Sequence, residues 1–491
     1  MEVLSRTALA NLPPEVRVPT YDASRLETGI VHLGVGAFHR AHQAVYTDDV
    51  ILSDDMRWGI LGASLRSAVT RNALQGQDWL YTLAENSQSG MRLRVIGSLQ
   101  GLLVAPENPV ALIEAMAAPK VKIVSLTVTE KGYCQNPATG DLNEEHTDIR
   151  HDLANPTTPR SAPGLITRAL DLRKQRNLDP FTVLCCDNLP ANGPTVRKVV
   201  TRLANLQDQQ LGRYIADTIA FPSTMVDRIV PATTVADRNK VDAALGFHDH
   251  WPVMTEDFTQ WVVEDHFPAG RPDWAATLVS DVNPYETMKL RLLNGAHSCI
   301  AYLGYLSGHE TVFDAMHDAN LAAFVRRLMD TEVTPTLRLP ADTDVEIYKT
   351  ALIKRFHNPS LRHRTWQIAM DGSQKLPQRL LGTIRDRLKI GAPIECLALG
   401  VAAWMRYVTG TDEKRNPTDV RDPISTELRR LADSAGLFAN RLAPALLEVE
   451  GIFGKDLPVN PTFEAAVTKA LDQLITRGVR QTLISYGRQN A

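Results

Sequence analysis

Two kinds of hydrophobic patterning divide the chain. In the first half, short continuous runs of β-branched and apolar residues occupy positions 29–36, 58–64, 121–129 and 181–188. Runs of this length are typical of strands in a parallel sheet that is covered on both faces. Helix-like stretches such as 110–118 and 165–176 lie between some of them. The alternation predicts a doubly wound α/β domain, and the run at 93–104 predicts a hairpin inserted in it.

After about residue 285 the strand-like runs give way to helical spacing. Apolar residues recur every three or four positions in 288–306, 320–332, 344–356, 395–410 and 463–479. This spacing is typical of amphipathic or buried helices. We therefore predict an α/β domain over 1–285 and a mostly α-helical domain over 286–491.

Composition narrows the class of protein. A chain of 491 residues is long for one core, so two domains are expected. The 53 Lys and Arg against 56 Asp and Glu argue against a basic nucleic-acid-binding surface. No apolar run approaches 18 residues, so no membrane span is predicted, and the N-terminus does not resemble a signal peptide. The five cysteines form no CxxC and no zinc spacing, which indicates reduced thiols and a cytoplasmic location.

The sequence HLGVGAFHRAHQAVY at 32–46 joins a predicted strand to a helical pattern. Gly34 permits a tight turn, and Gly36 lets a pyrophosphate approach the helix N-terminus. Together with Ala37 and Phe38, these are the candidate residues for binding a dinucleotide in a Rossmann-type domain. The third glycine of GxGxxG is absent because His39 stands there, so a plain strand–turn–helix is the alternative.

The end of the second predicted strand bears on the choice of coenzyme. An acidic residue there commonly binds the adenosine ribose, but residues 63–71 read ASLRSAVTR and offer only Arg66 and Arg71 as charged groups. Arg66 is a candidate cofactor-binding residue. NAD is the expected coenzyme and NADP is not excluded; in the alternative interpretation both arginines are simply solvated.

Two histidine pairs have spacings that metal sites use. These are His39 with His42, and His248 with His250. Neither pair comes with a carboxylate in a pattern such as HExxH. We therefore predict no metal site.

Polar residues follow two of the predicted strands. Glu130 lies in TVTEKGY and Asn188 in CCDNLPANG. Ligands of doubly wound sheets bind beyond the carboxyl ends of the strands, so both are candidates to face a substrate or a nicotinamide ring. The alternative for Asn188 and its neighbour Asp187 is that they cap the next turn or helix.

The sequence TMKLRLLNGAHS at 287–298 places Lys289, Asn294 and His297 on an otherwise apolar helical stretch. A buried ammonium is costly unless it is paired or loses its proton. On an ideal α-helix Asn294 lies about 140° and His297 about 80° from Lys289. In a pocket, the amine would move a proton, the amide would donate to a developing alkoxide, and the imidazole would orient hydroxyls. The alternative is a core helix whose lysine reaches solvent.

Five blocks carry a resemblance to a known family. GVGAFHRAHQA, SLTVTEKGYC, CDNLPANG, FPSTMVDRIVP and MKLRLLNGAHS resemble the blocks of the mannitol dehydrogenase family, the polyol-specific long-chain dehydrogenases. The similarity runs from about residue 12 to 480. It implies a metal-independent, NAD(P)-linked secondary-alcohol dehydrogenase and ketone reductase that acts as a monomer.

The resemblance also implies roles for individual residues. It implies a general acid/base at Lys289 and oxyanion donors at Asn188 and Asn294. It implies that His297 positions the substrate and the lysine, and that Glu130 passes protons to solvent. Asp227, which binds substrate hydroxyls in this comparison, rests on the resemblance alone.

The run NPSLRHRTWQIAMDGSQKLPQRLL at 358–381 is similar to the branch of the family that interconverts D-fructuronate and D-mannonate. A hexuronate differs from a ketohexose by a carboxylate, and Arg362, Arg364 and Lys375 are cations suited to bind it. In the alternative interpretation one or two of them are only surface charges, and the rival substrate is a neutral polyol such as mannitol, arabinitol or altritol. The family's mannitol dehydrogenases also use a lysine near this place, so Lys375 alone does not discriminate between the two. The family's mannitol dehydrogenases carry acidic residues near the positions of Ala68 and Val69, so a strict preference for NAD does not transfer.

Overall fold

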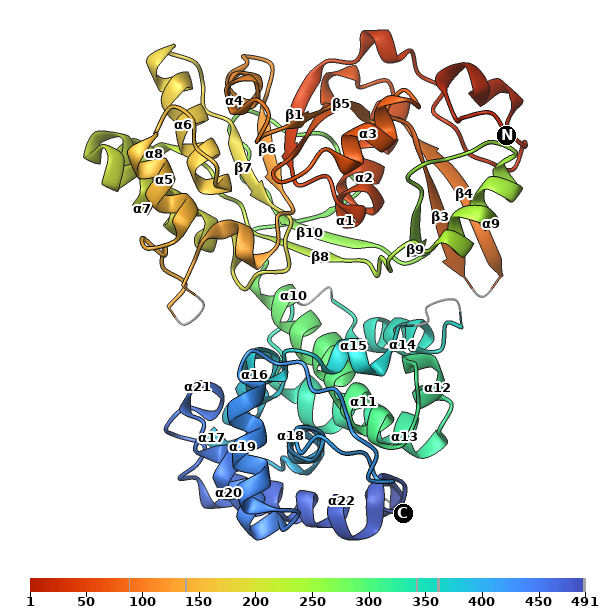
Figure 1. Cartoon of the computed structure of the whole chain (residues 1–491), viewed down its shortest axis with the longest axis vertical. Helices are drawn as coiled ribbons and strands as arrows, with labels where there is room; N and C mark the ends of the chain where they lie inside the picture. Colours follow the sequence, from red (N-terminus) through yellow and green to blue (C-terminus); the bar gives the residue numbers. More distant parts are fainter. Residues whose placement is uncertain (88, 137–138, 341–342, 360–362, 489–491) are drawn as a thin grey trace. The chain divides into compact units, whose positions relative to one another are not determined.

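A five-stranded parallel sheet forms the centre of the first of two structural units (Figure 1). The computed structural model describes residues 1–87, 89–136, 139–340, 343–359 and 363–488. The units are Met1–Asn283 and Pro284–Ala491. In the central sheet the strands lie in the order β5 (Leu99–Val104), β2 (Gly59–Ser64), β1 (Thr28–Leu33), β6 (Ile123–Leu126) and β7 (Thr182–Cys185).

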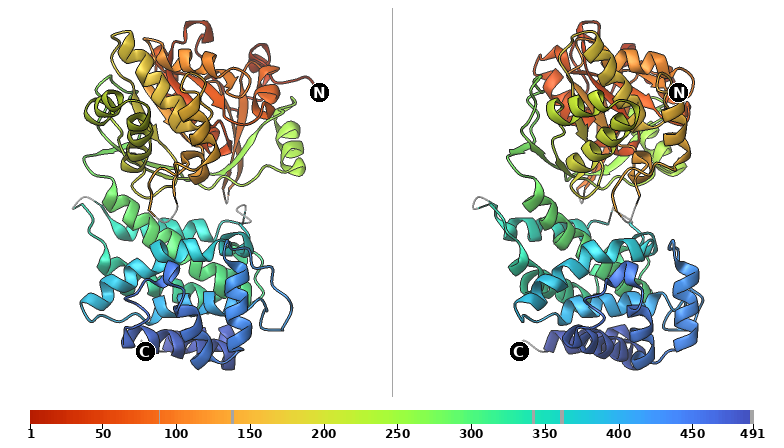
Figure 2. Two further views of the ribbon diagram at one scale, coloured as in Figure 1. Left: turned by 60° about the vertical axis from the view of Figure 1, so that its left-hand side comes forward. Right: turned by 90° about the vertical axis from the view of Figure 1, so that its left-hand side faces the viewer.

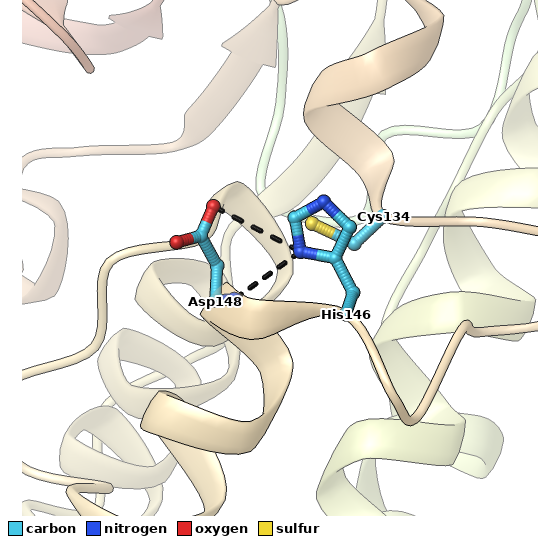
Figure 3. A group of neighbouring side chains, drawn as sticks. All are labelled: Cys134, His146 and Asp148. Atoms are coloured by element: carbon cyan, nitrogen blue, oxygen red, sulfur yellow. Dashed lines mark hydrogen bonds and ion pairs between the residues drawn. The ribbon is translucent and has the colours of Figure 1, made fainter.

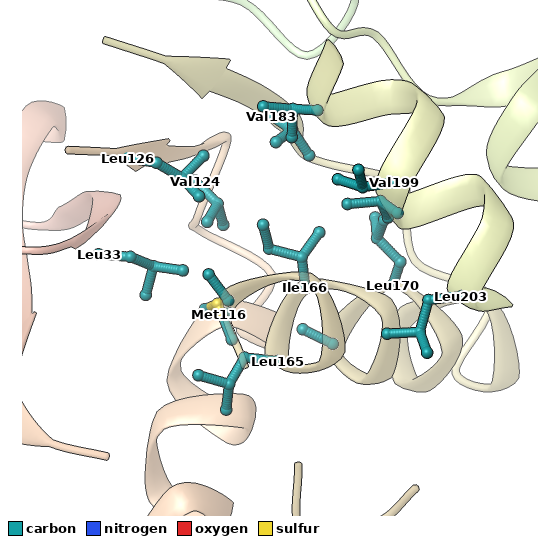
Figure 4. Close-up of a cluster of buried hydrophobic side chains, with 14 of the residues drawn as sticks. Leu33, Met116, Val124, Leu126, Leu165, Ile166, Leu170, Val183, Val199 and Leu203 are labelled. Atoms are coloured by element: carbon teal, nitrogen blue, oxygen red, sulfur yellow. The ribbon is translucent and has the colours of Figure 1, made fainter. Parts of the chain in front are cut away.

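Alternate residues of each central strand face two different cores. In β7, Val183 and Cys185 pack on one side and Leu184 on the other. Figure 4 shows the first core, where side chains of the sheet meet α4 (Pro109–Ala117), α6 (Ala162–Gln175) and α7 (Asn192–Gln207). Burial on both faces explains why the strands read as continuous apolar runs, and the predicted doubly wound fold is confirmed.

The strand order reverses between β1 and β6. From β1 the chain proceeds to β2 on one side, and it later returns to place β6 on the other side of β1. Such a switch point leaves a crevice at the carboxyl ends of the two strands, where doubly wound folds bind ligands. The residues that follow β1 and β6 therefore define the candidate coenzyme site.

The predicted hairpin at 93–104 is wrong. β4 (Gly90–Ile96) pairs with β3 (Tyr81–Ser87), whereas β5 joins the central sheet beside β2. The residues between β4 and β5 bond to other elements and do not form a hairpin turn. Gly97 N donates to Asp48 Oδ1 at 3.0 Å, and Ile60 N donates to Ser98 O at 2.9 Å. The apolar pattern alone did not show that two sheets share this run.

Two further sheets of three strands complete the first unit. One has the order β11-β10-β8 and the other β4-β3-β9. Their remaining strands are β8 (Thr224–Asp227), β9 (Val253–Glu256), β10 (Gln260–Glu264) and β11 (Thr277–Val279). The other helices of the unit are η1 (Arg6–Asn11), η2 (Ala23–Arg25), α1 (Ala37–Ala41), α2 (Gln43–Leu52), η3 (Met56–Trp58), α3 (Val69–Gln75), η4 (Glu130–Tyr133), α5 (Thr147–Ala154), α8 (Gln209–Thr218) and α9 (Val235–Leu245).

Among its described residues, the second unit contains helices joined by loops and no β-strand (Figure 2). Its elements are α10 (Asn283–Met288), η5 (Lys289–Asn294), α11 (Gly295–Leu306), α12 (Val312–Met316), α13 (Ala319–Arg327), η6 (Leu328–Val333), η7 (Thr334–Thr336), α14 (Val345–Phe356), α15 (Thr365–Ala369), α16 (Gly372–Leu376), η8 (Pro377–Leu381), α17 (Gly382–Lys389), α18 (Glu395–Tyr407), α19 (Ser425–Ala435), α20 (Ala439–Leu447), α21 (Glu450–Phe453) and α22 (Pro461–Arg488). Three of them, η5, η6 and η8, are π-helical.

The core of the second unit is built around α18. Every residue from Cys396 to Tyr407 is buried, as expected for a helix that is apolar all round. It packs closely on α11, because a Cβ added at Gly400 would lie 2.6 Å from Cys299 Sγ. This close approach fixes the helix that follows the Lys289 segment.

Across the described residues, no helix is both long and apolar enough to span a bilayer. All five cysteines are buried and none is in a disulfide.

Candidate functional site

The turn after β1 is held tightly against the end of β6. Gly34 has φ +96°, and a Cβ at this position would lie 2.2 Å from the carbonyl oxygen of Thr127. Thr127 Oγ1 donates to Gly34 O at 2.7 Å, and His32 Nε2 lies 2.8 Å from the same hydroxyl. Both the positive φ and the close approach require glycine at position 34.

Gly36, by contrast, faces open space. A Cβ built on it would meet only Gly34 O, at 4.0 Å. It is the N-cap of α1, so the free backbone N–H groups of Ala37 and Phe38 follow it. The space and these donors fit the pyrophosphate of a dinucleotide. The helix beyond is short, because His42 has non-helical backbone angles (φ −126°, ψ −96°).

The two arginines after β2 differ in their partners. Arg71 makes an ion pair with Glu107, so its charge is balanced by a carboxylate of the protein. Arg66 is exposed just beyond Ser64, the last residue of β2. Of the two, Arg66 is therefore the candidate to contact the adenosine ribose, which Rossmann-type domains bind after the second strand.

The loops after β6 and β7 are tied to each other. Asp187 Oδ2 accepts from Val128 N at 2.8 Å and from the Tyr133 hydroxyl at 2.6 Å, while its Oδ1 accepts from Thr129 N at 3.1 Å. Burial raises the pKa of this carboxyl. Asp187 therefore joins two loops and does not cap the next helix, α7, whose N-cap is Ala191.

The candidate residues on these loops are exposed. Glu130 is the first residue of η4, directly after Thr129, which has φ +64°. Asn188 follows Asp187 and is also exposed on its unit. Asp227 differs from both, since it ends β8 and is only 4% exposed. Glu130 and Asn188 thus lie after the carboxyl ends of the neighbouring strands β6 and β7.

Lys289, Asn294 and His297 lie on one continuous helical stretch of the second unit. Lys289 and Asn294 are the first and last residues of the π-helix η5, and His297 lies in the first turn of α11. All three are buried, with 7 to 8% of their surface exposed. The ideal α-helical angles expected from the sequence do not apply, because a π-helix closes its bonds between residues i and i+5.

Aromatic rings and two arginines lie near His297. Its ring centroid lies 4.8 Å from that of Phe356 and 5.8 Å from that of His363. Burial holds the pKa of His297 well below its usual range, and the neighbouring imidazole of His363 and the positive charges of Arg379 and Arg355 lower it further. His297 is therefore neutral at pH 7 and has one donor and one acceptor nitrogen.

Arg379 fixes the backbone beside Asn294. Its Nη1 donates to Ser298 Oγ at 3.2 Å and to Asn294 O at 3.5 Å. It belongs to η8, a second π-helix that packs on η5. Sequence analysis missed Arg379, although its position in the run at 358–381 was a usable signal.

The predicted carboxylate-binding residues have different environments. Lys375 Nζ donates to Met370 O at 2.6 Å and to Ile368 O at 3.3 Å. Arg364 has a side chain that is 61% exposed, 3.7 Å from Glu310 Oε1. Arg362 lies outside the described residues.

His363 and Arg355 are further residues that sequence analysis missed. His363 Nδ1 is buried and has no hydrogen-bond partner in the part of the chain that the structure describes. Burial and the charges of Lys375 and Arg379 lower the pKa of His363. Arg355 is 6% exposed. His363 stands in the same Arg-His-Arg run as Arg364, whereas Arg355 lies in a helical pattern with no motif to mark it.

The histidine pairs considered as metal ligands are packed in other ways. His39 is fully buried and stacks on His32 with centroids 3.4 Å apart. His42 Nε2 lies 3.2 Å from Gln260 O. His248 stacks edge-on against His250 and bonds Asp242 Oδ2 at 2.5 Å. None of these pairs belongs to a cluster of potential metal ligands among the described residues.

Comparison with known proteins covers nearly the whole chain. Residues 28–276 match the mannitol dehydrogenase Rossmann domain, and residues 281–475 match the mannitol dehydrogenase C-terminal domain. D-mannonate oxidoreductase of Escherichia coli (strain K12) is 49% identical over 481 residues, covering 96% of this chain and 98% of the relative. Mannitol 2-dehydrogenase of Aspergillus terreus is 40% identical over 484 residues, covering 96% of this chain and 95% of the relative.

A solved structure agrees with these matches. Mannitol 2-dehydrogenase of Pseudomonas fluorescens, in a ternary complex with NAD and D-mannitol, superposes with a TM-score of 0.88 at 39% identity and covers 99% of both chains. The resemblance and the fold predicted from the sequence are thereby confirmed. The chain is a member of the mannitol dehydrogenase family of oxidoreductases.

Proposed function

We propose that this enzyme interconverts D-fructuronate and D-mannonate with NAD as coenzyme. The observation that carries the choice of a uronate is the set of basic side chains near His297: the charges of Arg355 and Arg379 act on His297, and those of Lys375 and Arg379 act on the neighbouring His363. A carboxylate is the substrate group that such a set favours most. The 49% identity to D-mannonate oxidoreductase supports the same choice.

The coenzyme is NAD, as expected from the sequence. Gly36 leaves room for a pyrophosphate, and the solved relative holds NAD. Gly34, Gly36, Ala37 and Phe38 would hold the phosphates and Arg66 the adenosine end. The bound nicotinamide supplies or accepts the hydride, and no metal ion is needed for that step.

The protein's part in the reaction is to move one proton and to stabilise one oxyanion. In the reducing direction, the Lys289 ammonium gives its proton to the oxygen that was the C5 ketone of the substrate. Asn294 and Asn188 donate hydrogen bonds to that oxygen as its negative charge develops. Neutral His297 orients a substrate hydroxyl, and Asp227 accepts from others. Glu130 returns a proton from solvent.

Recognition of the carboxylate is assigned to the cations of the second unit. Lys375, Arg362 and Arg364 were predicted for this role from the sequence. The burial of Arg355 and the unpartnered Nδ1 of His363 add two further groups. Charge-assisted bonds are stronger in a partly buried site than at the surface, so we rank Lys375 above the exposed Arg364.

A neutral polyol is the alternative substrate. It is favoured by the 39% identity and TM-score of 0.88 to a mannitol 2-dehydrogenase. In that case Lys289, Asn188 and Asn294 keep their roles, and the cations of the second unit do not act on a substrate charge.

The deciding experiment compares D-fructuronate with D-fructose at equal concentrations, with NADH oxidation followed by absorbance. We expect a higher kcat/KM for fructuronate. We also expect Arg364→Met to raise KM for fructuronate about tenfold, about 1.4 kcal/mol, and to leave fructose turnover nearly unchanged, because Arg364, unlike Lys375, belongs to the Arg-His-Arg run that separates the uronate branch. Lys354→Met, an exposed cation on α14, is the matched control. A preference for fructose would leave a polyol dehydrogenase and remove the carboxylate argument.

We further propose a monomer in the cytoplasm. The location is supported by five free, buried thiols, an arrangement typical of reducing compartments. Sedimentation equilibrium tests the monomer, and an assembly larger than one chain of 54.3 kDa would contradict it.

A further inference from the structure

Three potential metal ligands meet on the segment between β6 and α5. They are Cys134, His146 and Asp148, and one ligand atom of each lies within 4.8 Å of the other two. Figure 3 shows the imidazole of His146 between the thiol and the carboxylate. Within the described residues, this is the one cluster of three such side chains.

The backbone holds these side chains in place before any ion binds. His146 is the N-cap of α5, and its Nδ1 accepts from Asp148 N at 3.2 Å. Cys134 adopts a left-handed conformation with φ +52°. Its carbonyl accepts from Asn143 N at 2.8 Å. The bond between Asn143 and Cys134 therefore holds Cys134 close to the N-terminal end of α5.

Carboxylates lie near Cys134, and the cluster is open to solvent. Asp148, itself one of the three side chains, and Asp152 both act electrostatically on the thiol of Cys134. Arg66 acts in the opposite direction. Since His146 and Asp148 have side chains that are 37% and 47% exposed, an ion can reach the cluster from solvent.

We propose that Cys134, His146 and Asp148 bind a thiophilic divalent metal ion such as Zn²⁺, at a site separate from the hydride-transfer chemistry. Thiolate, imidazole and carboxylate are the ligands that Zn²⁺ takes in proteins, and water completes the tetrahedron. Ligand atoms of such a site lie roughly 3.3 to 3.8 Å apart, as follows from its bond lengths. The ligand atoms, which now lie within 4.8 Å of one another, would therefore close by at most about 1.5 Å when the ion binds.

Binding exchanges a proton for the metal. The thiol of Cys134 loses its proton to solvent as the sulfur–metal bond forms, and the carboxylate and neutral imidazole bind without such a loss.

The ion would fix a loop that leads to the proposed active site. Cys134 directly follows Tyr133, whose hydroxyl bonds Asp187, the neighbour of Asn188. Zn²⁺ would thus stabilise the conformation of η4 and of Cys134, which follows it. This role does not depend on the identity of the substrate.

Cobalt is the probe, because Co²⁺ replaces Zn²⁺ and is coloured. The chain is treated with chelator, desalted and titrated with Co²⁺. We expect one ion per chain, with a thiolate-to-cobalt charge-transfer band in the near ultraviolet and visible bands of tetrahedral coordination. Zn²⁺ should abolish the spectrum and raise the thermal midpoint, since a ligand of the native state stabilises it.

Matched variants identify the ligands. Cys134→Ser should remove the charge-transfer band, whereas Cys396→Ser in the second unit should keep it. His146→Asn retains a good N-cap residue and should weaken binding at least about tenfold. Asp148→Asn should weaken it too, and Asp141→Asn on the same loop should not.

Two results would overturn the proposal. One is a titration of the unmodified chain without a thiolate band; the other is equal affinity in the unmodified chain and in His146→Asn. If Cys134→Ser fails to fold, His146→Asn decides alone. Because no substrate is used, the outcome is independent of the proposed reaction.

Discussion

Lys289 and Asn294 stand at the two ends of a single π-helical turn, η5. In an α-helix these positions would lie about 140° apart. The π-helix joins residues i and i+5, as in the bond from Gly295 N to Leu290 O, and this rotates the two side chains toward one face. Isolated π-turns occur frequently at functional sites. The geometry therefore places the amine of Lys289 and the amide of Asn294 on the same side of one helical stretch.

Replacing Lys289 by Met should abolish the proton transfer and spare the coenzyme. We expect kcat to fall by about 10²- to 10⁴-fold, the usual contribution of a general acid, while NADH affinity measured by fluorescence titration stays within about twofold. Lys389→Met, on a lysine whose side chain is 73% exposed, should change neither quantity. Turnover in Lys289→Met close to that of the unmodified enzyme would remove the lysine from the mechanism.

The two glycines of the nucleotide loop should respond differently to alanine. Gly36→Ala adds a methyl group where only one atom lies as near as 4.0 Å, so the thermal midpoint should hold. If a pyrophosphate occupies that space, NADH affinity should drop at least about tenfold. Gly34→Ala meets a carbonyl oxygen at 2.2 Å with φ +96°, which should destabilise the fold by about 2 kcal/mol or more. Unchanged NADH affinity in Gly36→Ala would place the phosphates elsewhere.

The sequence predicted those parts of the fold that follow from a single physical requirement, such as burial of a strand on both faces. Strands of the central sheet are buried on both faces, so residues such as Val183 and Leu184 are apolar without alternation, and position 34 needs glycine for steric reasons. The hairpin at 93–104 failed because both strands of that run have the same apolar pattern whichever sheet they join. The pairing of β4 with β3 and of β5 with β2 distinguishes the two arrangements, and it is seen only in the structure.

Parts of the candidate site could not be predicted from the spacing of residues along the sequence. Residues of η5 were placed by α-helical periodicity, and no sequence rule indicated the π-turn. Arg379 and Arg355 are distant in sequence from His297 and reach it only through the packing of helices. Cys134 and His146 are twelve residues apart with no motif between them, so the loop that joins them had to be seen in the structure.

Arg66 should control the use of NADPH. Arg71 is paired with Glu107, so Arg66 is the arginine available to attract a 2′-phosphate. No acidic residue in 63–71 would repel that phosphate. We expect measurable NADPH oxidation, lowered about tenfold in kcat/KM by Arg66→Met, with NADH oxidation changed less than about twofold. Arg71→Met is the matched control. Equal losses with both coenzymes would show that Arg66 does not discriminate between them.

Acid should destabilise the enzyme through its buried histidines, His32 most clearly. Its Nδ1 lies 2.8 Å from Ser125 Oγ, and burial lowers its pKa to about 3. An unfolded histidine has a pKa of about 6.5. Between these values the unfolded chain binds a proton that the folded chain does not, so stability falls with pH by about 1.4 kcal/mol per unit for this residue.

Stability should also fall with falling pH because of His39 and His297, whose pKa values are likewise lowered by burial. The thermal midpoint should therefore be flat above about pH 6.5 and fall steadily below it. His32→Gln keeps a polar side chain without a titrating group and should make the fall shallower by one proton. His317→Gln, on an exposed histidine, should leave the slope as it is. A His32→Gln profile parallel to that of the unmodified enzyme would mean that His32 is protonated in the folded state.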